Sequence, residues 1–403
     1  MKILHVVEEN QTLPKVGLSA FLGGLCIFLL IPPNATGIPP HLFAAEFSFI
    51  LLMLINFDRK IFLRSRDSLF AIFLFILYLY LAVHSKELSF KGFSYTILLP
   101  LVICAKKDYT KAVFCAFTKI YVYLMLLSCI VYLLVLIGVP LPHEYWSLDD
   151  ASSYTIVDVY AKICGVSTMR FCAYFQEPGV VGTISAIILM AYRFRLKPLY
   201  LAVLVFSGIA SFSFAFFIII GLYAIICSQS WKVTIGVVIV SGILYLCFYD
   251  LLNELVLYKI TYGENALDFN RTHGDFNSFY ESFKKTNAYY WGLGGGTSLI
   301  YNPGGAYYKD IIVDYGVVFF VLYTISYMFY SRVIIKPYLS WISYLLVLLL
   351  ILYQRPFIVL PTYLFLLYAP MIVLKDNASQ LRSIDKINII KSGKSSCTKT
   401  ELI

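Results

Sequence analysis

Long apolar runs alternate with short polar stretches along almost the whole chain. Runs such as 112–138 and 231–249 are long enough to cross the hydrocarbon core of a bilayer, which takes about 20 helical residues. The pattern predicts an all-α polytopic membrane protein with about twelve transmembrane helices. They are placed at 16–31, 41–57, 68–84, 92–105, 112–138, 178–194, 198–210, 212–228, 231–249, 310–330, 337–353 and 356–374. The alternative for the pair 198–210 and 212–228 is one long bent helix.

The composition supports a membrane protein. Hydrophobic residues make up 60% of the chain and charged residues only 14%, which is far from the balance of a soluble domain. The net charge of +9 does not indicate a nucleic-acid partner, because Lys and Arg are scattered between the apolar runs and cluster in short connecting loops. The predicted partners of these surfaces are membrane lipids.

The distribution of Lys and Arg predicts the orientation. If the N-terminus is cytoplasmic, 21 of the 32 Lys and Arg residues fall in cytoplasmic loops and the C-terminal tail, and ten fall in outer loops. Cytoplasmic loops are enriched in these residues, so both termini are predicted to be cytoplasmic. Residues 1–374 form a single transmembrane domain in this interpretation, and the polar segment 375–403 is a cytoplasmic, disordered tail.

Two outer loops, 139–177 and 250–309, are too long to be simple connections. Long structured loops often carry function. In the second loop, aromatic residues recur at positions i, i+3, i+4 and i+7, from Phe276 to Phe283. This spacing predicts an amphipathic helix that lies on the bilayer or caps a cavity.

The first outer loop ends in a segment, 169–179, that crowds an arginine and a glutamate beside a helix start. Pro178 suits the first turn of a helix, so a helix is predicted to begin at Glu177-Pro178-Gly179. The planar guanidinium of Arg170 suits a phosphate or carboxylate ligand, and the alternative is an arginine that extends into lipid headgroups. Glu177 is a candidate catalytic residue, with a helix cap as the alternative.

The second outer loop contains Asn270-Arg271-Thr272-His273-Gly274-Asp275. His273 is a candidate proton acceptor near neutral pH, and Arg271 is a second candidate cation. The alternative is a solvated turn ahead of the amphipathic helix.

The glycine-rich stretch 292–297 does not match a nucleotide-binding loop. Thr297 stands where the dinucleotide motif needs its third glycine, and no lysine follows as in a Walker loop. A tight turn that lets two backbones approach closely is the favoured interpretation. Binding of a sugar or pyrophosphate by the glycine amides is the alternative.

Other outer residues extend the candidate site. Arg355 lies in a short outer turn and adds a cation that can converge with Arg170 and Arg271 on one anion. Aromatic residues of the outer segments offer flat faces for sugar rings, although aromatic residues are also frequent at membrane interfaces without a ligand. The sugar-binding candidates are Tyr290, Trp291 and Tyr307.

The nine cysteines show no metal-site spacing. Most lie inside apolar runs and suit a packing role. Cys164 and Cys172 share the first outer loop and can form a disulfide in an oxidising compartment, an alternative to two free thiols. No His, Cys, Asp or Glu motif of a metal site is present, so no metal is expected.

Three motifs stand out along the chain. The first is Arg170-Phe171 followed by Phe175-x-Glu177-Pro178-Gly179-x-x-Gly182-Thr183. The second lies at 207–217, with the core Ser211-Phe212-Ser213-Phe214-Ala215. The third pairs Trp291-Gly292-Leu293-Gly294 with Asp314-Tyr315-Gly316-Val317-Val318-Phe319. Together they resemble the Wzy-type polysaccharide polymerases and the pattern that these share with O-antigen ligases.

This resemblance implies a bacterial inner-membrane enzyme with a GT-C-like fold. Such an enzyme acts at the periplasmic face on undecaprenyl-diphosphate-linked oligosaccharide, without metal, nucleotide or other cofactor, and a chain-length regulator protein is an expected partner. The resemblance assigns diphosphate binding to Arg170 and, less directly, to Arg271. The ligases usually have a histidine in the region that matches 304–308 here, and its absence favours polymerase over ligase.

The resulting hypothesis combines the candidate residues. Arg170, Arg271 and Arg355 neutralise the departing lipid diphosphate, and Glu177 or His273 takes the proton of the incoming sugar hydroxyl. The alternatives are an O-antigen ligase, which transfers polysaccharide to lipid A-core, and a transporter that flips lipid-linked oligosaccharide. A transporter should carry functional charge within its spans, whereas here the charge lies in two outer loops.

Overall fold

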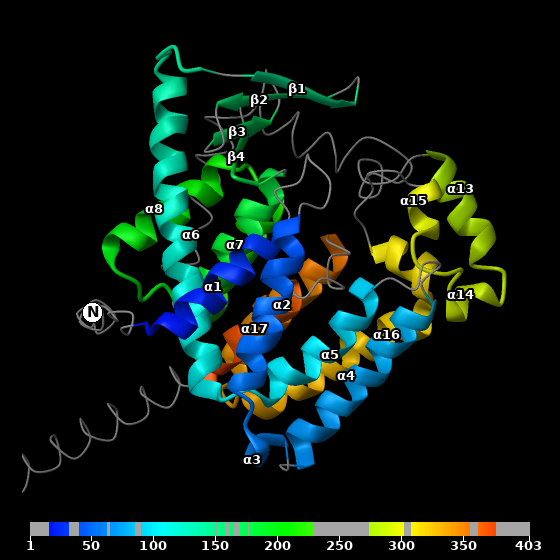
Figure 1. Cartoon of the computed structure of the whole chain (residues 1–403). Helices are drawn as coiled ribbons and strands as arrows, with labels where there is room; N and C mark the ends of the chain where they lie inside the picture. Colours follow the sequence, from blue (N-terminus) through cyan, green and yellow to red (C-terminus); the bar gives the residue numbers. More distant parts are fainter. Residues whose placement is uncertain are drawn as a thin grey trace, which may run out of the picture.

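The computed structural model describes residues 16–31, 40–62, 65–84, 90–142, 144–149, 152–157, 161–164, 170–175, 177–228, 274–301, 308–354 and 362–375. This part of the chain is mainly helical and includes one small sheet (Figure 1). The helices before the sheet are α1 (Leu18–Leu30), α2 (Pro40–Ile55), α3 (Arg59–Phe62), α4 (Ser65–His84), α5 (Phe90–Cys104) and α6 (Lys107–Leu136). Those after it are α7 (Pro178–Ala191), α8 (Pro198–Ala210), α9 (Phe214–Ser228), α13 (Gly274–Phe283), α14 (Ala288–Trp291), α15 (Thr297–Tyr301), α16 (Tyr308–Ile334), α17 (Tyr338–Gln354) and a last helix, Thr362–Lys375.

The predicted apolar spans coincide with helices, except for 231–249, which lies outside the described residues. The runs 198–210 and 212–228 form two helices, α8 and α9, rather than one bent helix. Three of the described helices are long and apolar enough to cross a membrane, namely Arg66–His84, Lys107–Leu136 and Tyr308–Ile334. The structure therefore supports a helical membrane protein, while the number of spans stays a prediction.

A four-stranded antiparallel sheet is an addition to the predicted all-α architecture. It lies within the loop 139–177 and follows the chain in the order β1 (Glu144–Asp149), β2 (Ser152–Val157), β3 (Ala161–Cys164) and β4 (Arg170–Ala173). β2 is rich in Thr, Tyr, Ile and Val, which favour strands. The strands are only four to six residues long, too short for a clear alternation of polar and apolar positions in the sequence.

Helix α7 lies at the centre of the core. All of its residues except Gly179 are buried, and a helix that is apolar on every side is typical of a protein interior. With 14 residues it is about 21 Å long, shorter than a bilayer core of roughly 30 Å. It contacts α8, α9, α17 and β4, so the first-loop segment leads directly into an almost fully buried helix.

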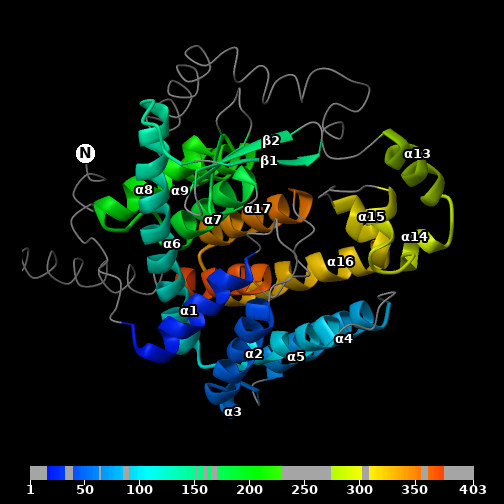
Figure 2. The same ribbon diagram turned by 45° about the horizontal axis from the view of Figure 1, so that its top comes forward.

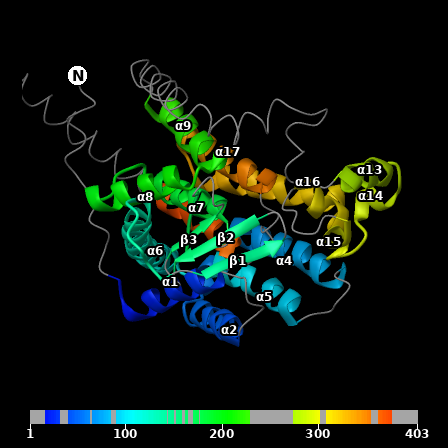
Figure 3. The same cartoon turned by 90° about the horizontal axis from the view of Figure 1, so that it is seen from above.

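The described helices share two ends. At one end of the assembly lie the first residues of α4 and α6 and the last residues of α5, α7 and α16. At this end the amide of Lys106 donates to the carbonyl of Asn56 at 3.0 Å. We call it the basic end, because α3, the α5–α6 junction and the α7–α8 and α16–α17 turns place Lys and Arg there. The other end carries the sheet and is called the sheet end (Figures 1 and 2). Viewed from above, the sheet covers the middle of the helical assembly (Figure 3).

The amphipathic helix predicted in the second outer loop is confirmed as α13. Phe276, Tyr280 and Phe283 are buried, and they pack against Ile312 and Val313 of α16. The apolar face of α13 is therefore covered by protein, near the beginning of α16, in the manner of a cap.

Gly182 allows α7 to approach the turn between α8 and α9. A Cβ atom at Gly182 would lie 2.3 Å from the Cβ of Ser213 and 2.7 Å from its Oγ. Gly182→Ala should therefore lower the free energy of unfolding by about 1–3 kcal/mol, the usual cost of overpacking. Thermal unfolding of the detergent-purified protein measures the effect.

The matched control is Gly221→Ala in α9, where a Cβ atom would meet nothing within 4 Å. This variant should be at least as stable as the wild type, because alanine favours a helix over glycine by about 0.5–1 kcal/mol. Equal unfolding temperatures for the two variants would contradict the close approach at Gly182.

Candidate functional site

The first-loop segment forms the junction between β4 and α7. α7 begins at Pro178 in its first turn, which confirms the predicted helix start. Glu177 is the N-cap residue, with extended backbone angles, but its side chain makes no capping hydrogen bond. Glu177 therefore does not cap α7 through a side-chain hydrogen bond. What remains of it is the favourable interaction of a carboxylate with the positive end of the helix dipole.

Arg170 binds the turn between α8 and α9. Its Nε donates to the carbonyl of Ser211 at 3.3 Å and its Nη2 donates to the carbonyl of Phe212 at 3.2 Å. These carbonyls end α8, where the helix dipole is negative, so a fixed cation is favourable there. Phe212 has a φ of 45°, an uncommon conformation for a side-chain-bearing residue, and the guanidinium helps to stabilise it.

The first two motifs of the sequence therefore meet in space. Arg170 holds the Ser211–Phe212 turn, and Gly182 lets α7 pack against Ser213. Gly208 in α8 allows a similar approach by the ring of Phe216, since a Cβ atom there would lie 2.1 Å from the ring. The result is one unit: the half-buried Arg170 holds the turn that packs on α7 at Gly182, and the half-buried Glu177 immediately precedes α7.

The third motif forms a second unit around a break in α16. Gly316 has φ 86° and ψ 157°, which interrupts the helix. The loop 292–296 lies against this break: the amide of Leu293 donates to the carbonyl of Val313 at 2.8 Å, and that of Gly294 to the carbonyl of Asp314 at 3.0 Å. A Cβ atom at Gly292 would lie 2.3 Å from the Asp314 carbonyl oxygen, so the two backbones touch.

The glycine-rich loop does not bind a ligand through its amides. Besides Gly294, the amide of Gly295 donates to the carbonyl of His84 at 3.0 Å, and that of Gly296 to Asp314 Oδ2 at 3.1 Å. These donors are already used within the protein. The close-approach interpretation is confirmed, and the interpretation as a sugar or pyrophosphate cradle is wrong.

Asp314 has a structural role in this unit. Its Oδ1 accepts from the amide of Ser298 at 2.7 Å, and its Oδ2 accepts from the hydroxyl of Ser298 at 3.0 Å as well as from Gly296. The buried carboxylate thus satisfies the first amides of α15.

Two residues of α4 belong to this unit and were not found from the sequence. The hydroxyl of Tyr80 donates to the carbonyls of Trp291 and Tyr315, the latter at 3.3 Å. The ring of His84 stacks on that of Tyr80, with centroids 5.0 Å apart. More than 200 residues separate Tyr80 from Trp291, and the only signal in the sequence is a histidine at the end of a predicted span.

The structure describes only part of the predicted site. Tyr290 and Trp291 lie on α14 with exposed fractions of 53% and 60%, so both rings are accessible. The other predicted site residues, Arg271, His273, Tyr307 and Arg355, lie outside the described residues. Their convergence with Arg170 and Glu177 stays a prediction.

Cys172 in β4 is disulfide-bonded. The sequence hypothesis pairs it with Cys164, which ends β3, the strand next to β4. By contrast, Cys26, Cys104, Cys115 and Cys129 are buried and form no disulfide. Disulfides persist mainly in oxidising compartments.

Within the described ranges, no three His, Cys, Asp or Glu side chains are grouped so that they could hold a metal ion. Comparison of the chain with protein-family models, with curated proteins and with solved structures finds no match.

The carboxylate of Asp314 should be needed to keep the 292–301 segment in place. Asp314→Ala leaves the amides of Gly296 and Ser298 without an acceptor, which should lower the free energy of unfolding by about 1–3 kcal/mol per unsatisfied group. Hydrogen exchange of these amides should speed up accordingly.

Asp314→Asn is the matched control, since it keeps one carbonyl oxygen as an acceptor and should have a smaller effect. Unchanged exchange in Asp314→Ala would show that the loop is held by its other contacts alone.

Proposed function

We propose that the protein is a bacterial inner-membrane glycosyltransferase of the O-antigen polymerase type. It joins undecaprenyl-diphosphate-linked oligosaccharide repeat units into O-antigen or a related surface polysaccharide at the periplasmic face, without a metal ion. The proposal rests on the resemblance of the three motifs to Wzy-type polymerases. The observation that supports it best is that the first two motifs form one unit, in which Arg170 holds the α8–α9 turn beside the start of α7.

The proposed orientation places the basic end in the cytoplasm and the sheet end in the periplasm. The Lys and Arg residues of the α3, α5–α6, α7–α8 and α16–α17 connections lie at one end, as expected for cytoplasmic loops. The disulfide of Cys172 at the other end fits an oxidising compartment. The two observations are independent, and both support the same orientation.

In the proposed reaction, a hydroxyl oxygen of the acceptor sugar attacks the anomeric carbon of the donor. A new carbon–oxygen bond forms as the bond from the anomeric carbon to the diphosphate oxygen breaks, and its electron pair leaves with the diphosphate. Arg170, with Arg271 and Arg355, stabilises the negative charge that develops there. Glu177 or His273 accepts the proton of the hydroxyl.

The contacts of Arg170 suit this role. Its bonds to the Ser211 and Phe212 carbonyls fix the guanidinium, so little reorganisation is needed when charge develops. Glu177 precedes α7 as its N-cap residue, so its carboxylate lies at the positive end of the helix dipole. Tyr290 and Trp291 offer exposed aromatic faces to sugar rings.

An O-antigen ligase and a flippase for lipid-linked oligosaccharide are the alternative functions. The polysaccharide ladder of a deletion strain separates the three. Loss of a polymerase leaves core with a single repeat unit, loss of a ligase leaves bare core, and loss of a flippase retains the unit inside the cell.

Arg170→Ala should abolish long polymer in a complementation assay, with a loss of about 10²–10³-fold in activity, as for the removal of one fixed donor to a developing anion. Because Arg170 also supports the α8–α9 turn, the amount of the variant protein in the membrane and its unfolding temperature must be measured in the same experiment. Arg170→Lys keeps the charge and should retain more activity than Arg170→Ala.

The control is Arg195→Ala, which removes an arginine at the opposite end of α7 and should leave chain length unchanged. Normal polymer in Arg170→Ala would exclude the diphosphate role.

Glu177→Gln tests the proton acceptor. The amide has nearly the same shape but no basicity, so polymer synthesis should fall by about 10²–10⁴-fold if Glu177 is the general base. Ladder length and the initial rate with isolated lipid-linked substrate are the measurements. Activity near the wild-type level would leave His273 as the candidate base.

A further inference from the structure

The basic end contains a cavity that the proposed reaction does not use. It has a volume of about 600 Å³ and lies among α3, α4, the α5–α6 junction, α16 and the last helix. Five basic and three acidic side chains line it. The basic ones are Lys60, Arg66, Lys106, Lys107 and Lys375.

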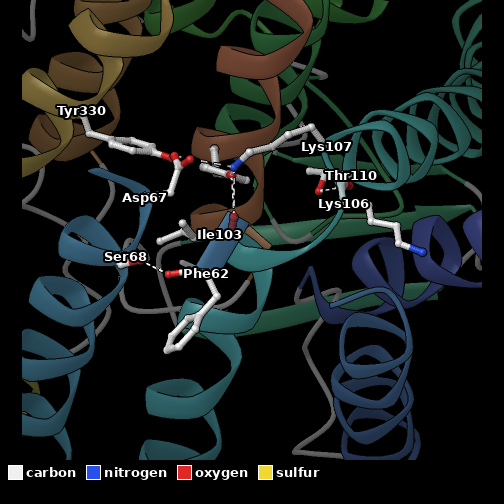
Figure 4. Close-up of polar contacts among 9 residues, drawn as sticks. Phe62, Asp67, Ser68, Ile103, Lys106, Lys107, Thr110 and Tyr330 are labelled. Atoms are coloured by element: carbon white, nitrogen blue, oxygen red, sulfur yellow. Dashed lines mark hydrogen bonds and ion pairs between the residues drawn. The ribbon is translucent and has the colours of Figure 1, made fainter. Parts of the chain in front are cut away.

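A buried polar network forms one side of this cavity. Asp67, only 2% exposed, accepts a hydrogen bond from the hydroxyl of Tyr330 at 2.7 Å and lies 4.0 Å from Lys107 Nζ. Lys107 also donates to the carbonyl of Ile103 at 3.0 Å and to the hydroxyl of Tyr368. Figure 4 shows Asp67, Lys107 and Tyr330 pointing toward one another, whereas Lys106 extends away from them.

The remaining cations have no such partners. Asp58 accepts from the amide of Lys60 at 2.8 Å, and Asp67 is engaged with Lys107 and Tyr330. Within the described part of the chain, the side chains of the other four basic residues form no hydrogen bond or ion pair. These residues are Lys60, Arg66, Lys106 and Lys375. The cavity therefore presents an excess of positive charge and suits an anion.

An apolar groove adjoins the cavity. It has a volume of about 320 Å³, runs between α4 and α16, and is lined mainly by Phe70, Phe73, Leu322, Ile325 and Phe329. Arg66 lines both the groove and the cavity. A ligand that spans both would have an anionic head beside Arg66 and an apolar chain along the groove.

The three described helices that are long enough to cross a membrane all have one end at this cavity. α4 and α6 begin here, and α16 ends here. The ends of membrane-spanning helices lie at the depth of lipid headgroups. We propose that the cavity and the groove together bind one phospholipid with a net negative headgroup, its phosphate beside Arg66 and Lys106 and one acyl chain between α4 and α16.

Native mass spectrometry of the full-length protein in a zwitterionic detergent tests this proposal. Phosphatidylglycerol should bind at least about tenfold more tightly than phosphatidylcholine with the same acyl chains, because only the first has a net charge. Glycerol phosphate has the anion without the chains and should bind far more weakly. Equal binding of the two lipids would contradict the charge argument, and glycerol phosphate that displaces phosphatidylglycerol would indicate a soluble phosphoester instead.

Paired double variants locate the site. R66Q with K106Q removes two unpaired cations of the cavity and should abolish the preference for phosphatidylglycerol. R195Q with K197Q removes the same charges from the α7–α8 turn at the same end and should keep it. Retained preference in the first pair overturns the proposal. If the variant with R66Q and K106Q is unstable in an unfolding assay, the comparison of phosphatidylglycerol, phosphatidylcholine and glycerol phosphate on the wild type still tests the proposal. Neither test depends on glycosyltransferase activity.

Discussion

Backbone carbonyl groups that are freed where a membrane helix breaks must find donors inside the protein, because lipid offers none. The described chain contains two interruptions of its helical backbone, which we call breaks: the turn between α8 and α9, and Gly316 within α16. Each is satisfied from a distant part of the sequence. At the α8–α9 break, Arg170 donates to the carbonyls of Ser211 and Phe212. At the α16 break, Gly294 and Tyr80 donate to the carbonyls of Asp314 and Tyr315. These two sets of bonds join segments that lie far apart in the sequence, and the first adjoins the buried helix α7.

The same requirement explains where chemistry can take place. Irregular backbone at membrane depth is tolerated where it is enclosed by protein or lines a polar cavity, so helix breaks are natural positions for a site. At the first break the donor is an arginine rather than a neutral group, which leaves a fixed positive charge beside the start of α7. At the second, the donors are neutral groups: the amides of Leu293 and Gly294 and the hydroxyl of Tyr80, which donate to the carbonyls of Val313, Asp314 and Tyr315. The first break is therefore the one that the proposed function uses, and the second holds the segment that carries the exposed rings of Tyr290 and Trp291.

Local signals in the sequence were sufficient for elements whose cause is local. Pro178 fixed the start of α7, and the spacing from Phe276 to Phe283 predicted α13 and its buried face. Contacts between distant segments could not be predicted in this way. Nothing in the sequence indicates that Tyr80 reaches Trp291, that Arg170 faces Phe212, or that the short strands from 144 to 173 pair with one another. Asp314 is an example. Its role as an acceptor for the amide of Ser298 depends on where the loop places Ser298, which the sequence alone does not indicate.

Helix α16 connects the two ends of the molecule. Asp314, at its beginning, holds α15, whereas Tyr330, sixteen residues later and about 24 Å away along the axis, takes part in the network of Asp67 and Lys107. Gly316 interrupts the backbone of α16 close to Asp314, and the hydrogen bond from Tyr330 to Asp67 anchors the helix at the basic end. An anionic lipid bound beside Arg66 would strengthen that anchor without contacting the loop at the sheet end. Charge is thus arranged differently at the two ends: at the sheet end one arginine is fixed by carbonyls, whereas at the basic end four cations line the cavity that we propose binds a lipid headgroup.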